Sequence, residues 1–127
     1  MAKEIILTTN APAPIGPYSQ AVKVGNTLYV SGQIPLNAQT GQLENESIEA
    51  ETTCVMKNIE AVLAAAGFEF SDVVKSTIFI TDMNQFSKIN TVYGSYFTLN
   101  PPARETVQVA RLPKDVNVEI SVIAVKL

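Results

Sequence analysis

The stretch "VNVEISVIAV" (116–125) decides the fold of this chain. Its residues alternate in character, which predicts a β-strand over 116–126. One face of that strand is wholly apolar and carries Val116, Val118, Ile120, Val122 and Ala124. Ile123 and Val125 place apolar groups on the opposite face too. A sheet that contains this strand therefore needs an apolar cover on both sides.

The rest of the chain adds five strands and two helices. Strand patterns occur at 3–7, at 20–32 as a hairpin around a Gly25-Asn26 turn, at 72–82 and at 104–110. Helical spacing of apolar residues occurs over 46–66, which ends at Gly67, and over 84–98. The order β-β-β-α-β-α-β-β predicts an α+β fold, in which a mixed sheet carries both helices on one face.

Two local expectations concern the face of a strand residue and the charges at the start of a helix. Strict alternation places Val74 on the same face as Ile78, whereas Val73 faces the other way. Glu49 and Glu51 lie in the first turns of the first helix, where their charges complement the positive end of the helix dipole.

Two helices can cover only one face of the sheet. The apolar groups on the second face are then expected to be buried against another subunit, which predicts an oligomer. The alternative is that these side chains lie under loops.

Length and composition restrict the classes of protein that fit. The 127 residues suit one domain over 1–127, and 46% hydrophobic with 17% charged residues argues against disorder. A net charge of −3 and a pI near 4.9 argue against a nucleic-acid binder that tracks phosphates. The sequence contains neither a signal-peptide pattern nor a segment that could span a bilayer, so the cytoplasm is the simplest compartment.

The sequence lacks histidine, which is the usual general base near neutral pH. Its one cysteine, Cys54, falls in the apolar pattern of the first helix and is interpreted as a small buried hydrophobe. Neither an intrachain disulfide nor a zinc site is expected, and no motif for a cofactor is present.

The stretch "PPARETVQVARLPKD" (101–115) holds the first candidate for chemistry, Arg104. If the last two strands form a hairpin whose polar faces coincide, Thr106 lies opposite Glu119 and Arg104 is diagonally adjacent to it. Arg104 and Glu119 could then form only a cross-strand ion pair, worth about 0.2–1 kcal/mol. Alternatively, Arg104 clamps a small carboxylate through its planar fork, and Glu119 acts as the general acid and base on a water.

Three further positions have both a structural and a functional interpretation. Tyr18, in the loop "PIGPYSQ", either anchors that loop or touches a ligand. Gly32, at a strand end, either forms an ordinary turn or leaves the backbone open to a ligand. Asn90 is either a solvated residue of the second helix or part of a site beside its apolar stripe.

Four separated blocks resemble the RidA (YjgF) family of enamine/imine deaminases: "APAPIGPYSQAV", "LYVSGQIP", "VVKSTIFITDM" and "PPARETVQVARLPKDVNVEISVIAV". The resemblance covers nearly the whole chain. It implies a chorismate-mutase-like fold, with a six-stranded sheet and two helices. It also implies a homotrimer around a central barrel, with three sites in the clefts between subunits.

The resemblance also implies roles for single residues and a reaction. Arg104 would bind the substrate carboxylate and Glu119 would position the hydrolytic water; the pocket would be lined by Tyr18, Gly32, Asn90 and the backbone of Thr106, where many members have cysteine. The implied reaction needs no metal or cofactor. It converts 2-aminoacrylate or 2-iminobutyrate to pyruvate or 2-oxobutyrate plus ammonia, and it protects pyridoxal-phosphate enzymes from these reactive acids.

Other functional classes remain open at this point. The chain could be a non-catalytic trimeric protein that binds a 2-oxo acid or a similar metabolite through Arg104. An RNA-cleaving translation inhibitor and a chaperone are also attributed to members of the family. The acidic pI and the absence of histidine argue against the RNA-cleaving role.

Overall fold

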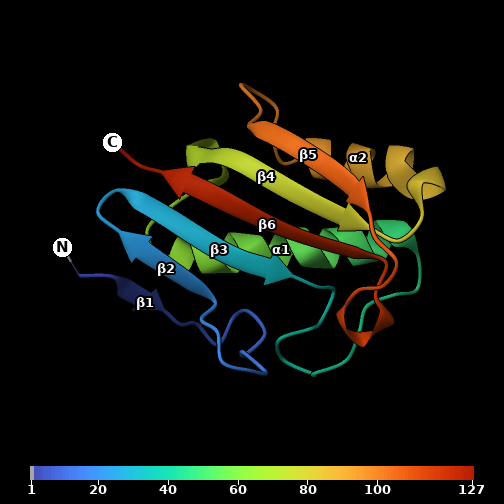
Figure 1. Ribbon diagram of the computed structural model, residues 1–127, viewed down its shortest axis with the longest axis horizontal. Helices are drawn as coiled ribbons and strands as arrows, with labels where there is room; N and C mark the ends of the chain where they lie inside the picture. The colour runs from blue at the N-terminus through green and yellow to red at the C-terminus, as the bar shows by residue number, and fades with distance from the viewer. Residues whose placement is uncertain (1) are drawn as a thin grey trace.

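The computed structural model describes residues 2–127, which form one six-stranded sheet with two helices (Figure 1). The elements are β1 (Glu4–Ile6), β2 (Ala21–Val24), β3 (Thr27–Gln33), α1 (Ile48–Ala65), β4 (Val73–Ile80), α2 (Phe86–Gly94), β5 (Ala103–Gln108) and β6 (Val118–Val125). Short 3-10 turns occur at Phe70–Asp72 (η1), Met83–Gln85 (η2) and Pro113–Asp115 (η3). The strand order is β1-β2-β3-β6-β4-β5, and only β4 and β5 run parallel. The predicted α+β fold with a mixed sheet is confirmed.

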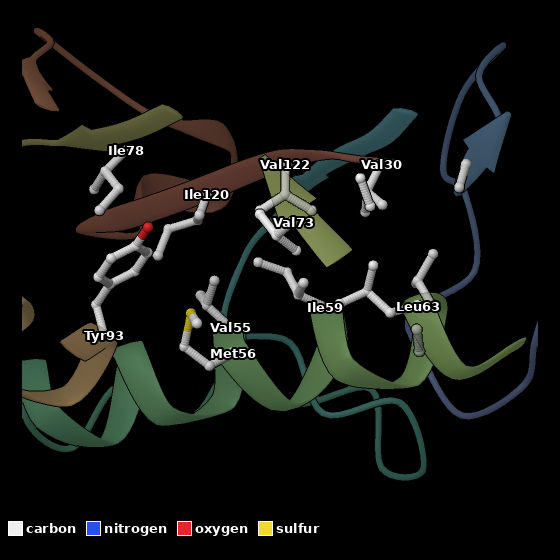
Figure 2. Packing of buried hydrophobic residues seen from close by; sticks show 14 of the residues in the cluster. Val30, Val55, Met56, Ile59, Leu63, Val73, Ile78, Tyr93, Ile120 and Val122 are labelled. Carbon is white, nitrogen blue, oxygen red and sulfur yellow. The ribbon is translucent and has the colours of Figure 1, made fainter. Parts of the chain in front are cut away.

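β6 lies in the middle of the sheet, and its apolar face forms the centre of the core. The alternate residues that were predicted to be buried are all buried: Val116, Val118, Ile120, Val122 and Ala124. Both helices lie behind the sheet in Figure 1, on this face. Figure 2 shows side chains of α1, among them Val55 and Ile59, pointing toward β6, which carries Ile120 and Val122.

The opposite face of the sheet has no helix over it within the described part of the chain. The strand register aligns Ile5, Val22, Tyr29 and Ile123 in one row across four strands of this helix-free face. Ile5 and Tyr29 are each 51% exposed. The second apolar face predicted for the last strand is therefore present.

Turn and cap residues fix where several elements begin and end. Gly25 has a φ of +58° in the two-residue turn between β2 and β3, which confirms the predicted hairpin. α1 begins after Ser47, whose side-chain oxygen accepts a hydrogen bond from the N–H of Ala50 at 3.0 Å. Gly67 has a φ of +82° just past the end of α1, as expected for a helix stop.

α2 is shorter than the predicted helix over 84–98. The 3-10 turn η2 precedes it, and after Gly94 the chain continues in tighter turns, because the N–H of Tyr96 bonds to the carbonyl of Tyr93 at 3.1 Å. These turns keep Tyr96 and Phe97 packed against the core.

The predicted face of Val74 is wrong. Val74 is 47% exposed, whereas Val73 is buried. The register between β4 and β6 shifts between Val73 and Lys75, so strict alternation fails at the start of this strand.

The predicted hairpin of the last two strands is also wrong. β5 does not pair with β6, because β4 lies between them and pairs with both. β5 therefore forms an edge of the sheet, as Figure 1 shows.

Candidate functional site

Arg104 lies on the helix-covered side of β5. Its partner in the parallel register with β4 is Ser76, which is buried under the helices. The Arg104 Nη1 donates a hydrogen bond to Oδ1 of Asn90 at 2.6 Å. The guanidinium carbon lies 5.5 Å from the ring centroid of Phe86 and 5.1 Å from that of Tyr93. The guanidinium is thus held by one hydrogen bond and two aromatic rings.

The three residues that hold Arg104 come from one face of α2, since Phe86, Asn90 and Tyr93 are spaced four and three residues apart. The Tyr93 hydroxyl donates to the Ser76 hydroxyl at 2.8 Å, which orients the ring. Burial raises the pKa of Tyr93, although the bond to Ser76 and the nearby guanidinium oppose this shift. We call Arg104, Phe86, Asn90 and Tyr93 the cationic half-site. Among residues 2–127, no carboxylate forms an ion pair with Arg104.

Glu119 lies on the opposite, helix-free face, in β6. It is half-buried, and burial raises the pKa of its carboxyl group. The backbone of Gly32 approaches it closely at an irregularity in the pairing of β3 with β6. A Cβ atom at Gly32 would lie 2.8 Å from Cδ and 3.0 Å from Cγ of Glu119, and closer still to its Oε2. Only glycine at this position leaves room for the carboxylate where it lies.

The Glu119 side chain lines a cleft of about 360 Å³. The other residues that line it include Ile15, Tyr18, Ser31, Gly32 and Ile34. Tyr18 is 50% exposed and accepts a hydrogen bond from the N–H of Ile15 at 3.4 Å, while the Ser31 hydroxyl donates to the carbonyl of Ser19 at 2.6 Å. We call Glu119, Gly32, Tyr18 and Ser31 the carboxylate half-site.

The two half-sites of one chain do not meet. Val107 and Glu119 both lie opposite Phe79, in β5 and β6 respectively, and Arg104 is three residues further along β5. Three residues along a strand and two strand spacings separate the Cα atoms of Arg104 and Glu119 by roughly 14 Å. Their side chains also point to opposite faces of the sheet.

The predicted diagonal contact between Arg104 and Glu119 is therefore wrong, and so is the pairing of Thr106 with Glu119. The alternation assigned each residue correctly to one side of its own strand. It did not tell which side of β5 matches which side of β6, because that depends on β4. Thr106 lies opposite Ile78, and its buried hydroxyl has no hydrogen-bond partner among residues 2–127.

Sequence reasoning did not assign Phe86 and Tyr93 to a site, because both fit the apolar stripe of the second helix. Their spacing with Asn90 was the signal that could have joined them to a cation. The structure brings Arg104 together with Asn90. It also brings Glu119 together with Gly32, in a cleft that Tyr18 lines as well.

Within residues 2–127 there is no cluster of three or more histidine, cysteine, aspartate or glutamate side chains that could ligate a metal. Neither α1 nor α2 has both the length and the apolar character that crossing a bilayer requires. Cys54 is buried, as predicted, and its pKa is raised to about 11, mainly by burial.

The chain resembles known proteins in both its sequence and its fold. The family model described as "Endoribonuclease L-PSP" matches residues 8–126. A RutC family protein of Pyrococcus horikoshii is 52% identical over 98% of both chains. The 2-iminobutanoate/2-iminopropanoate deaminase of Mus musculus is 47% identical over 98% of this chain and 92% of its own length. A solved structure of a Rid family protein from Yersinia pestis superposes with a TM-score of 0.96 at 52% identity, over 98% of this chain and 100% of that one.

Proposed function

This chain belongs to the Endoribonuclease L-PSP family, also known as the RidA (YjgF) family, and we propose that it hydrolyses reactive 2-imino acids to 2-oxo acids and ammonia. The substrates would be 2-aminoacrylate, after its enamine tautomerises to the imine, and 2-iminobutyrate; the products would be pyruvate and 2-oxobutyrate. The cellular role would be to protect pyridoxal-phosphate enzymes from these acids.

The observation that carries the proposal is the pair of half-sites. One offers an oriented guanidinium that has no carboxylate partner in the described part of the chain, and the other offers a half-buried carboxyl group with a raised pKa. Arg104 suits the substrate carboxylate, because its planar fork matches two oxygen atoms. Glu119 suits proton transfer, because burial moves the pKa of its carboxyl group toward neutral pH.

The chemistry is simple enough for these groups. The imine carbon is already electrophilic, so a held substrate and an aimed water supply most of what is needed. Glu119 would take a proton from that water as its oxygen bonds to the carbon, and would return it to the nitrogen to give a carbinolamine. It would then take the proton of the new hydroxyl and pass it to the nitrogen, which leaves as ammonia as the carbonyl forms.

We further propose that the complete site lies between two copies of the chain, in a homotrimer whose helix-free faces line a central barrel. Within one chain the Cα atoms of Arg104 and Glu119 are roughly 14 Å apart and the two side chains point to opposite faces of the sheet, so they cannot both reach one small substrate. The exposed apolar residues of the helix-free face, which include Ile5, Tyr29 and Val107, support its burial against further copies.

The reaction is tested with imine generated in place by a threonine dehydratase and trapped with semicarbazide. The wild-type protein should divert imine from the trap. If it binds 2-oxobutyrate but leaves trapping unchanged, the chain is the metabolite-binding protein and not the enzyme.

Mixing two inactive variants tests the shared site. Arg104→Ala and Glu119→Gln should each be inactive or nearly so. In a trimer that contains both variants, one site of three combines an intact Arg104 with an intact Glu119. Random mixing in equal amounts should therefore recover about one quarter of the wild-type activity. No recovery after exchange of subunits, or light scattering that shows a monomer, would contradict the shared site.

A further inference from the structure

Glu51 is a buried carboxylate for which the proposed reaction has no use. It lies in the first turns of α1, where its charge was expected to complement the helix dipole, and only 1% of it is exposed. Its Oε1 accepts a hydrogen bond from the backbone N–H of Asn117 at 3.0 Å, and its Oε2 accepts one from Nδ2 of Asn117 at 2.6 Å. Both oxygens are therefore directed at one residue at the start of β6.

Asn117 is held from the other side by Thr81, the first residue after β4. The backbone carbonyl of Asn117 accepts from the N–H of Thr81 at 3.1 Å, and its Oδ1 accepts from the Thr81 hydroxyl at 3.1 Å. The backbone and the side chain of Asn117 are thus each fixed twice, by Glu51 and by Thr81.

This network lies at the point where the chain enters both half-sites. Asn117 is separated from Glu119 by one residue of β6. Thr81 leads through η2 into α2, which carries Phe86 and Asn90 against Arg104. Displacing Asn117 would therefore move the start of β6 and the approach to α2 together.

Packing alone does not account for a carboxylate here. An ionised group is costly to bury unless hydrogen bonds compensate it, and an apolar side chain of similar size would fill the space without that cost. What the carboxylate adds is geometry, since two acceptors matched to the two donors of Asn117 fix its position and its rotamer.

We infer that Glu51 is a positioning residue that, through Asn117 and Thr81, sets the carboxylate half-site and the cationic half-site of each chain relative to each other. This inference rests on the proposed function for its effect on turnover. Its effect on the position of β6 can be measured separately.

Glu51→Gln is the sharpest test because it is nearly isosteric. The amide keeps one acceptor for the Asn117 N–H but turns an NH2 group toward Nδ2 of Asn117, so one hydrogen bond is lost. We expect kcat to fall about tenfold, with a smaller change in KM. This loss in kcat is less than the ~10²-fold that a 1 Å misplacement can cost. Amide hydrogen exchange of Val118–Ile120 should become faster.

The matched control is Glu49→Gln, which makes the same chemical change one half-turn away on the exposed side of α1. It should leave kcat and exchange unchanged. The rescue is Glu51→Gln combined with Asn117→Asp, which reverses donor and acceptor and keeps the net charge. The amide at position 51 can then donate to the carboxylate at position 117, and kcat and exchange should return most of the way.

Each result decides the inference. A lower unfolding midpoint in Glu51→Gln with normal kcat and normal exchange would show a merely structural role and overturn it. Equal losses in Glu49→Gln, or no recovery in the double variant, would also overturn it. If the wild type itself leaves trapping unchanged, the proposed reaction fails, and exchange at Val118–Ile120 alone decides whether Glu51 positions β6.

Discussion

Gly32→Ala should damage turnover while leaving the fold nearly as stable as before. The added Cβ would lie 2.8 Å from Cδ of Glu119, whereas ordinary contacts begin at 3.4 Å, and the nearer Oε2 must move further. The carboxylate must therefore retreat by roughly 1 Å, and a displacement of that size can cost about 10²-fold in rate. That loss corresponds to about 2.7 kcal/mol of transition-state stabilisation.

The stability of Gly32→Ala should change little for two reasons. The atoms that clash belong to the end of a flexible side chain, which can move without displacing the core. Gly32 is also not among the glycines with positive φ, so alanine can adopt its backbone conformation. Replacing glycine at such a position stabilises a protein by about 0.4–1 kcal/mol through the unfolded chain, which offsets part of the cost.

The assay is imine hydrolysis against the semicarbazide trap, with urea unfolding of the same preparations. Gly94→Ala is the control, because a Cβ there meets nothing within 4 Å. It should keep wild-type turnover. Wild-type turnover in Gly32→Ala as well would refute the argument that the close approach of Gly32 sets the working position of Glu119.

Three further variants separate charge, clamp and packing. Glu119→Gln should lower kcat about 10²-fold, the low end for a lost proton-transfer group, while 2-oxobutyrate still binds. Because burial raises the pKa of Glu119 above its ordinary 4.5, the fold disfavours ionisation of this carboxyl group relative to the unfolded chain. The stability of the wild type relative to Glu119→Gln should therefore fall as the pH rises from 4.5 through the raised pKa, and thermal unfolding from pH 4 to 8 that shows no such trend would contradict the shift. Arg104→Lys should weaken 2-oxobutyrate binding at least about tenfold, measured by calorimetry, because an ammonium cannot replace the two-point fork; near-normal binding would rule out the clamp. Tyr93→Phe should cost about 1–3 kcal/mol in urea unfolding, since it leaves the buried Ser76 hydroxyl without its partner, and an unchanged midpoint would show that this hydroxyl finds another one.

Local patterns predicted most of the elements of this protein. The alternation in 116–126 identified the central strand and its buried face, and the Gly25-Asn26 pair located the hairpin. The periodicity of the first helix and the stop at Gly67 placed its boundaries within two residues, because both signals lie within the segment itself. The end of α2 at Gly94 and the register shift at Val73 were not predicted, because tertiary packing overrides local preference at element boundaries.

The candidate site shows the same division. Arg104 and Glu119 could be named as candidates from the sequence, because both lie on polar faces of predicted strands and in a block that resembles the RidA family. Their relation in space could not, since alternation tells only which residues of one strand share a face. The burial of Glu51 was missed for a related reason, as its partner Asn117 is 66 residues away.

The sequence by itself therefore determined the elements, the buried face of the central strand and the chemical groups available. Only the tertiary structure decided that β4 lies between β5 and β6, and with that which groups share a face. The physical reason is that side-chain periodicity is a property of one strand, whereas strand neighbours are chosen by hydrogen bonds and packing between segments distant in the chain. That choice places Arg104 under α2 and Glu119 on the helix-free face of the same chain.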